Sequence, residues 1–214
     1  MTRLRCASLL LGLLSLSSPR FTAGENEAKA VFAAGCFWSV ELAFQRVHGV
    51  LSTSVGYAGG NTENPTYRDV TTGQTGHAEA VEVVYNPDAL SFDKLMQLFW
   101  NIHDPTTLNR QGGDVGTQYR SAVWYNSRDQ LEAIERSIRV LPHKREKLTT
   151  KIRPMGGSFK YWMAEDYHQQ FLQKGGQDAT KGSLKPIQCY GNRGPIKKMD
   201  KPEIQEVLGG AREL

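Results

Sequence analysis

The apolar positions of the chain change their spacing at about residue 35, and this change predicts a strand that runs into a helix. Residues 30–34 form an unbroken apolar run with the length of a short buried strand. The apolar residues after it recur at intervals of three and four, which is typical of an amphipathic helix. These residues are Phe37, Val40, Phe44 and Val47. Cys36 is therefore expected at the junction, where the helix begins.

Further strands are predicted along the chain, with two long loops between them. The strongest is 77–85, in which every second residue from Glu79 to Tyr85 shares one face. The others are 51–56, 120–125 and 148–152. Polar, glycine-rich stretches at 57–76 and 104–117 are predicted to be loops, and loops of this length inside a compact domain are often functional.

Helices are predicted between these strands. Ser91 can cap one of them, and Ser127 with Gln130 has the spacing of a capping box at the start of another. A helical stretch is also expected at 164–172. Because strands and helices interleave, we expect an α+β fold: a single two-layer α/β domain with a mixed central sheet flanked by helices, long loops and an irregular C-terminal tail.

Both ends of the chain differ in composition from the middle. Residues 1–24 combine a cationic start with a short leucine-rich run and no acid, which predicts a cleavable targeting leader. The leader fits the secretory pathway or an organelle such as a plastid or mitochondrion. If the leader were retained, the protein would be cytoplasmic. The alternative to a leader is a buried N-terminal helix. The folded domain is expected at 25–192 and a flexible tail at 193–214, with one short helix at 202–208.

Composition excludes several classes of protein. The 214 residues suffice for a hydrophobic core without a disulfide framework, and the three cysteines form no Cys-x-x-Cys pair of the kind that binds structural zinc. The net charge of +4 gathers largely in the leader and at 185–201, which does not indicate a nucleic-acid groove. We expect no metal, no cofactor, no membrane span in the mature form, and a monomer.

Cys36 is the first candidate for chemistry. A free thiol has a pKa of about 8.5, and the N-terminus of a helix stabilises its ionised form. Free cysteines are also among the most buried residues, so position alone leaves a reactive and an inert cysteine about equally plausible. Phe37 and Trp38 follow at once, and one of them is expected to lie exposed beside the thiol, where sulfur packs well on rings. Plain core packing is the alternative.

Glu79 is the second candidate. It shares a strand face with Val81 and Val83, where an ionised carboxylate is costly to bury and tends to be protonated. An edge position that turns to solvent is the alternative. Tyr67, Asp114 and Tyr119 lie in or beside the two long loops and are weak candidates when each is taken alone.

Together these residues lie in a series of motifs, which begins with Gly35-Cys36-Phe37-Trp38. The series closely resembles the A-type peptide-methionine (S)-S-oxide reductase family from about residue 31 to 191. The further motifs are Gly56-Tyr57-Ala58-Gly59-Gly60, Asn64-Pro65-Thr66-Tyr67-Arg68, Thr75-Gly76-His77-Ala78-Glu79, Phe99-Trp100-Asn101-Ile102-His103, Gly116-Thr117-Gln118-Tyr119-Arg120 and Ala164-Glu165-Asp166-Tyr167-His168.

The resemblance implies a role for each candidate. Cys36 is expected to attack the sulfoxide sulfur, and Glu79 to protonate the sulfoxide oxygen. Tyr67 and Tyr119 are expected to donate hydrogen bonds to that oxygen, while Asp114 orders the site. Phe37 and Trp38 are expected to form the wall for the substrate methyl group. Because an ionised Glu79 would oppose formation of the Cys36 thiolate, we predict that Glu79 is protonated in the resting site.

The resemblance also implies a redox cycle. Attack leaves Cys36 as a sulfenic acid, which condenses with a second thiol. Cys189 is the only other cysteine outside the leader, and Ser183 occupies the region where relatives often carry a further relay cysteine. We therefore expect a single Cys36–Cys189 disulfide that a thioredoxin-like partner reduces. Oxidised proteins or peptides and free methionine sulfoxide are the expected substrates.

Two other functions remain open at this point. A cysteine hydrolase would use Cys36 with His77 or His168 as the base, together with an oxyanion hole. A non-enzymatic module that binds oxidised or methionine-rich surfaces would be indifferent to the replacement of Cys36.

Overall fold

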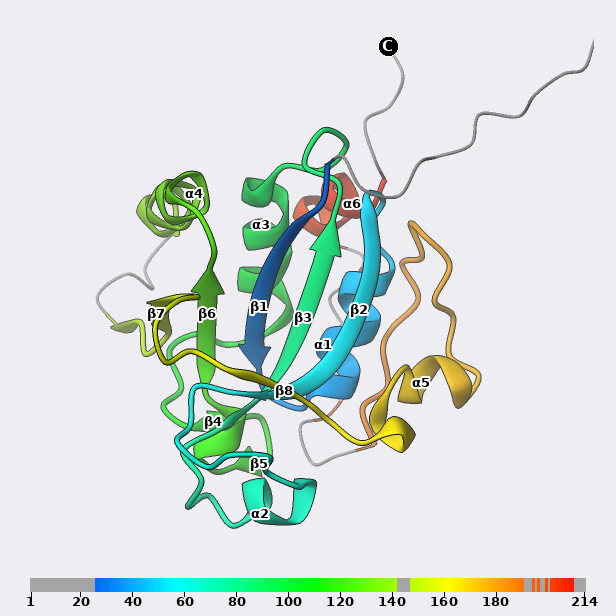
Figure 1. Ribbon diagram of the computed structural model, residues 1–214. Helices are drawn as coiled ribbons and strands as arrows, with labels where there is room; N and C mark the ends of the chain where they lie inside the picture. Colours follow the sequence, from blue (N-terminus) through cyan, green and yellow to red (C-terminus); the bar gives the residue numbers. More distant parts are fainter. Residues whose placement is uncertain are drawn as a thin grey trace, which may run out of the picture.

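A six-stranded sheet forms the centre of the computed structural model, which describes residues 26–141, 147–190, 194, 196, 199 and 201–209. The strands lie in the order β7-β6-β1-β3-β2-β8 (Figure 1). Neighbouring strands are antiparallel except β6 and β7, which are parallel, so the sheet is mixed, as expected. Its strands are β1 (Ala28–Ala34), β2 (Val50–Ala58), β3 (Ala78–Tyr85), β6 (Ser121–Tyr125), β7 (Lys151–Pro154) and β8 (Tyr161–Met163).

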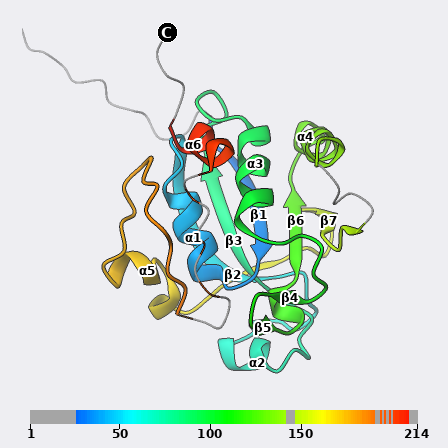
Figure 2. The same ribbon diagram turned by 180° about the vertical axis from the view of Figure 1, so that it is seen from behind.

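Helices cover one face of this sheet, which gives the expected two layers (Figure 2). They are α1 (Phe37–Gln45), α3 (Phe92–Ile102), α4 (Arg128–Arg139) and α6 (Pro202–Leu208). Short elements lie in the connecting segments: α2 (Tyr67–Thr71), β4 (Arg110–Gln111), β5 (Asp114–Val115), a 3₁₀ turn at Thr117–Tyr119, another at Asp166–His168, and α5 (Phe171–Lys174). Within the described part of the chain, no helix is long and apolar enough to cross a membrane.

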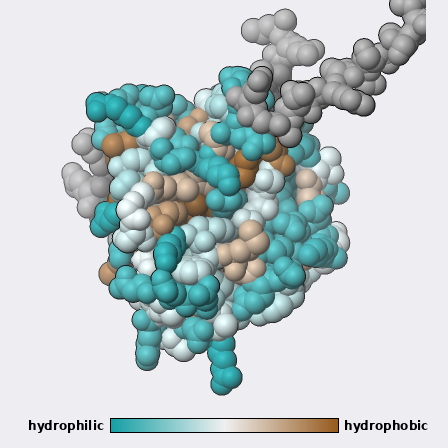
Figure 3. Space-filling model, in the orientation of Figure 1, coloured by the Kyte–Doolittle hydropathy of each residue, from teal (hydrophilic) through white to brown (hydrophobic). Residues whose placement is uncertain are grey.

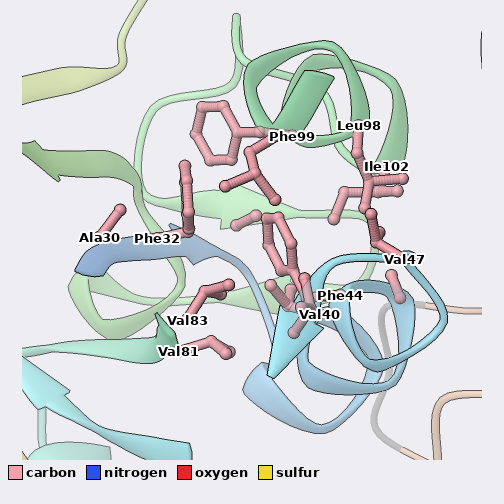
Figure 4. Packing of buried hydrophobic residues seen from close by; sticks show 14 of the residues in the cluster. Ala30, Phe32, Val40, Phe44, Val47, Val81, Val83, Leu98, Phe99 and Ile102 are labelled. Carbon is pink, nitrogen blue, oxygen red and sulfur yellow. The ribbon is translucent and has the colours of Figure 1, made fainter. Parts of the chain in front are cut away.

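The main core lies between the sheet and these helices (Figure 4). The ring of Phe32 on β1 stacks on that of Phe44 on α1, with the centroids 4.7 Å apart. Val81 and Val83 of β3 point into the same layer and are fully buried. The apolar residues that were predicted to share one face of the first helix are therefore the residues that pack on the sheet.

The other face of the sheet carries much smaller side chains, and no helix of the described residues covers it. Alanines line it, together with Trp124 of β6. The segment between β7 and β8 crosses this face, as the yellow trace in Figure 1 shows, and contributes Met155 and Phe159, while β8 contributes Tyr161. The alanines are Ala33, Ala58, Ala78, Ala80 and Ala122.

The prediction of a single helix at 164–172 is wrong. The chain forms the 3₁₀ turn and α5 instead, separated by Gln170 in the left-handed region at φ +52°. The buried carboxyl of Glu41 on α1 accepts hydrogen bonds from the backbone N–H of Gln170 at 2.9 Å and from its side-chain amide at 3.0 Å. A partner distant in sequence thus holds the break, which helical periodicity cannot reveal.

The Ser127 cap forms as predicted, but the capping box does not. Ser127 accepts the N–H of Gln130 at 3.2 Å. The side-chain oxygen of Gln130 accepts the N–H of Asn126 at 2.6 Å rather than that of Ser127, and its amide nitrogen donates to the carbonyl of Lys29 at 2.9 Å. Gln130 therefore ties α4 to β1 instead of closing the helix on itself.

The expectation of a loose C-terminal tail also needs correction. The predicted short helix is present as α6, and its Ile204, Val207 and Leu208 are buried against α3 and the main core. Upstream, Ile187 and Ile196 form an antiparallel bridge, and both are buried. The expected leader at 1–24 lies outside the described residues.

Candidate active site

Cys36 lies where β1 ends and α1 begins, as the apolar spacing predicts. It occupies the N-cap position of α1, and the preceding Gly35 has φ +92°, which allows the sharp turn out of the strand. Ser39 donates a hydrogen bond to the Cys36 carbonyl at 3.0 Å and so ties the first turn of the helix together. The side chain of Cys36 is 6% exposed.

Seven of the eight candidate residues line one small pocket at this point. Its volume is about 40 Å³, above the roughly 10–15 Å³ that a cavity needs to hold one water molecule. The loops at the lower end of Figure 1 bring α2, β5 and the 117–119 turn to the beginning of β3, where Glu79 lies. The lining residues are Cys36, Phe37, Trp38, Tyr67, Glu79, Asp114 and Tyr119. These residues come from five separate segments of the chain, so no single motif could predict that they meet.

Glu79 is buried on the helix-covered face of β3, as the alternation predicts. One carboxyl oxygen accepts the backbone N–H of Phe37 at 3.0 Å, which leaves the other oxygen for a ligand in the pocket. Burial raises the pKa of Glu79 to about 8, although the Phe37 hydrogen bond acts in the opposite direction. Glu79 is therefore protonated near neutral pH, as we predicted.

The thiol of Cys36 departs from the expectation of a lowered pKa. A hydrogen bond with the Cys189 thiol raises the pKa of Cys36 well above its usual value, and burial and the nearby Glu79 raise it further. The N–H of Trp38 in the first turn of α1 acts in the other direction, as expected of a helix N-terminus, but its effect is smaller. The resting Cys36 is a thiol, and Cys189 lies directly beside it.

Both loop tyrosines face this centre as protonated hydroxyls. Burial raises the pKa of Tyr67 to about 12, with further contributions from Glu79 and Cys36. The pKa of Tyr119 is raised in the same way, mainly by burial. The two hydroxyls also hydrogen-bond to each other. They can therefore act as a pair of neutral donors to an oxygen atom in the pocket.

The two aromatic residues after Cys36 differ in burial, and Trp38 is the more exposed of the two. Phe37 is buried, and its ring lies 5.1 Å from that of His168. Trp38 is only partly buried; it stacks on Phe171 at 4.0 Å, and its indole N–H donates to Nδ1 of His168 at 3.2 Å. Trp38 is thus the more open wall of the pocket, and the segment after β8 holds it in place.

Glu165 supports Tyr67, although no pattern in the sequence predicted a role for it. One carboxyl oxygen accepts the Tyr67 N–H at 2.8 Å, and the other accepts the Tyr57 hydroxyl at 2.7 Å. Glu165 thereby ties the start of α2 to β2. Its place in the motif that begins at Ala164 was the only available indication, because the contact spans about a hundred residues of chain.

Replacing Glu165 by alanine is expected to lower kcat/KM about tenfold for methionine sulfoxide, the substrate that the resemblance implies, because it frees the backbone that carries Tyr67. Glu165→Gln keeps an oxygen for the Tyr67 N–H and an amide for Tyr57, so it should recover most of the loss. Steady-state kinetics of both variants, compared with Tyr67→Phe, provide the test. An alanine variant with wild-type kinetics would contradict a positioning role.

The unfolding free energy of the reduced protein is expected to fall between about pH 6.5 and 8.5. Burial raises the pKa of Glu41 to about 7 and that of Glu79 to about 8, so the folded state retains protons that the unfolded chain has lost. His77 and His168 have lowered pKa values and act in the opposite direction, but only below about pH 6.5.

Urea unfolding at both ends of that range measures the fall. Glu79→Gln should reduce it, because this variant cannot release the buried proton. An unfolding free energy that stays constant or rises over the range would show that the two carboxyls are ionised in the folded protein.

Neither histidine proposed as a hydrolase base is directed at Cys36. His77 accepts the Gly60 N–H at 3.2 Å and contacts the Thr62 carbonyl at 2.8 Å with its other ring nitrogen. His168 accepts from Trp38, and its second nitrogen lies 4.0 Å from Glu165. Neither ring lines the pocket of Cys36.

A thiol beside a second thiol, with a protonated carboxyl and two neutral hydroxyls, defines a class of redox enzyme that uses a cysteine and a proton donor. The match to a family model agrees with this class. Residues 28–190 match the model of peptide methionine sulfoxide reductase, so the chain belongs to that family.

Similar proteins come from distant organisms. The chain is 53% identical to the chloroplastic peptide methionine sulfoxide reductase A4 of Arabidopsis thaliana over 171 residues, which is 76% of this chain and 64% of that protein. It is 55% identical over 149 residues to the peptide methionine sulfoxide reductase MsrA of Methanothermobacter thermautotrophicus, with 68% and 86% of the two chains covered.

Solved structures share the fold. Methionine sulfoxide reductase A of Corynebacterium diphtheriae has a TM-score of 0.66 at 40% identity, with 73% of this chain and 78% of that chain covered. The reduced form of Mxr1 from Saccharomyces cerevisiae has a TM-score of 0.65 at 33% identity, with 72% and 88% covered. The α+β domain deduced from the sequence is thus the fold of these reductases.

Proposed function

We propose that the protein reduces methionine S-sulfoxide, free or within polypeptides, to methionine, and so repairs oxidised proteins. The observation that carries this proposal is the placing of a buried, protonated Glu79 and two tyrosine hydroxyls in the pocket of Cys36. A departing oxide oxygen needs such donors, whereas a hydrolase needs a Cys–His pair, and a binding module needs no thiol.

The first step transfers the oxygen to Cys36. The Cys36 sulfur attacks the sulfoxide sulfur as a thiolate, while Glu79 gives its proton to the oxygen and recovers one from the thiol. Tyr67 and Tyr119 donate hydrogen bonds to that oxygen, Asp114 orders the site, and the substrate methyl group packs against Phe37 and Trp38. The products are methionine and Cys36 sulfenic acid, which together contain all the atoms of the sulfoxide and the thiol.

The second step uses Cys189. Its thiol attacks the sulfenic acid, which releases water and forms the Cys36–Cys189 disulfide. The hydrogen bond between the two thiols in the reduced protein supports this pairing. A thioredoxin-like dithiol then reduces the disulfide and regenerates both thiols, becoming a disulfide itself.

The catalytic domain is proposed to begin at about residue 25, to include α6, which packs on its core, and to act as a monomer. Residues 1–24 are proposed to be a cleavable leader, and the chloroplastic location in the name of the Arabidopsis relative supports a plastid among the candidate compartments. Fluorescence of a fusion that carries these residues, in intact cells, would identify the compartment.

An assay with separated sulfoxide epimers tests the function. The wild-type protein and dithiothreitol are supplied with the S or the R epimer of a methionine sulfoxide peptide and of the free amino acid. We expect methionine from the S epimer alone and no product with Cys36→Ser. Equal reduction of both epimers, or turnover by Cys36→Ser, would refute the proposal.

A further inference from the structure

One large cavity in the described part of the chain lies away from Cys36, on the face of the sheet that carries Trp124. It has a volume of about 790 Å³, within the range of about 300–1,000 Å³ that is typical of small-molecule sites. Residues 59–63, strand β7 and the segment between β7 and β8 line it, together with Trp124 of β6. Figure 3 views the molecule from this side and shows hydrophobic atoms set among hydrophilic ones.

Positive charge dominates the lining of this cavity. Four cationic side chains line it against one acidic side chain, Glu63. Glu63 is already paired with Lys160, whose ammonium group lies 2.6 Å from the carboxylate. The cations are Arg120, Lys151, Arg153 and Lys160.

Arg120 is the most informative of these cations, because it is only 5% exposed and has no carboxylate partner among the described residues. Its guanidinium donates to the carbonyls of Thr117 and Gly76, each at 2.9 Å, and to that of Ala58 at 3.4 Å, but its Nε finds no acceptor. A buried guanidinium without an opposite charge is costly. An anion in the cavity would offset that cost.

Lys151 and Arg153 stand two residues apart on β7, so both side chains lie on the same side of the strand. Both are exposed, and neither forms an ion pair within the described ranges. The ring of Phe159 lies 5.7 Å from that of Trp124, and both line the cavity with Trp162. The lining thus combines cations with an aromatic wall.

We propose that this cavity is a binding site for a small organic anion that carries phosphate or carboxylate groups. Arginine and lysine match both groups in charge and geometry, and the aromatic wall suits an apolar or planar part of the same molecule. The site lies on the other side of the sheet from Glu79, and its occupation does not depend on the proposed reduction.

Isothermal titration with pyrophosphate, citrate and ATP in low salt tests the proposal. Pyrophosphate and citrate separate phosphate from carboxylate recognition, and ATP adds a planar ring. We expect saturable binding of at least one probe with a dissociation constant below about 1 mM. The double variant Lys151→Gln/Arg153→Gln should weaken it about tenfold or more.

The matched control is Arg128→Gln/Arg139→Gln, which removes the same charge from α4, outside the cavity. It should bind the probe as the wild type does, and circular dichroism should show all three proteins folded. Three results would overturn the proposal: no saturable binding of any probe, unchanged binding by the cavity variant, or an equal loss in the control.

Discussion

Glu79→Ala is expected to lower kcat/KM for methionine S-sulfoxide by a factor of about a hundred to ten thousand, the usual contribution of a positioned proton donor. Glu79→Gln should lose much less. Its amide oxygen can accept the Phe37 N–H that now binds the carboxyl, and its NH₂ group can still donate to the sulfoxide oxygen. The comparison therefore separates hydrogen bonding from proton transfer.

The pH dependence of the rate adds a second measurement. Because the pKa of Glu79 is raised to about 8, the wild-type rate should fall above that pH as the acid ionises. In Glu79→Gln this fall should be absent. Glu82→Gln is the matched control, since Glu82 lies on the same strand but points to the opposite face. Equal losses and identical pH profiles for Gln and Ala at position 79 would remove the acid role.

Cys189→Ser is expected to lower turnover about a hundredfold or more when a thioredoxin-like protein is the reductant, because the sulfenic acid at Cys36 then has no neighbouring thiol to form a disulfide. Dithiothreitol is small enough to attack the sulfenic acid directly and should restore much of the rate. Gln188→Ser alters the adjacent exposed residue and should behave as the wild type.

Mass spectrometry after a single turnover without reductant distinguishes the intermediates. The wild type should lose two hydrogens, with Cys36 and Cys189 in one cross-linked peptide. Cys189→Ser should instead gain one oxygen on Cys36. A wild-type protein that keeps the oxygen on Cys36 while Cys189 stays free would exclude Cys189 from the cycle.

Local patterns predicted the elements that carry the site. The interval of three and four after Cys36 located α1, and the two-residue alternation placed Glu79 on the buried face of β3. These patterns arise from contacts between residues near in sequence. The motifs from the resemblance then supplied the loop residues Tyr67 and Tyr119, which no periodicity marks.

Contacts between distant residues account for what the sequence did not predict. The carboxyl of Glu41 breaks the expected helix at Gln170, and that of Glu165 fixes the start of α2. The raised pKa of Cys36 likewise depends on Cys189, which lies more than a hundred and fifty residues away in the chain. The energies of these contacts depend on how distant segments pack together, and they outweigh the local conformational preferences that a sequence pattern reveals.

The anchoring of the segment around Cys189 bears on the lifetime of an oxidised Cys36. Ile187 and Ile196 bridge on either side of Cys189, and α6 is buried against α3 farther along the chain. A thiol held beside its target reacts at a high effective concentration. A peroxide molecule must find the sulfenic acid by diffusion before it can form the irreversible sulfinic acid. The fixed segment therefore gives intramolecular capture the advantage in that competition, and should preserve the enzyme under the oxidising conditions that create its substrate.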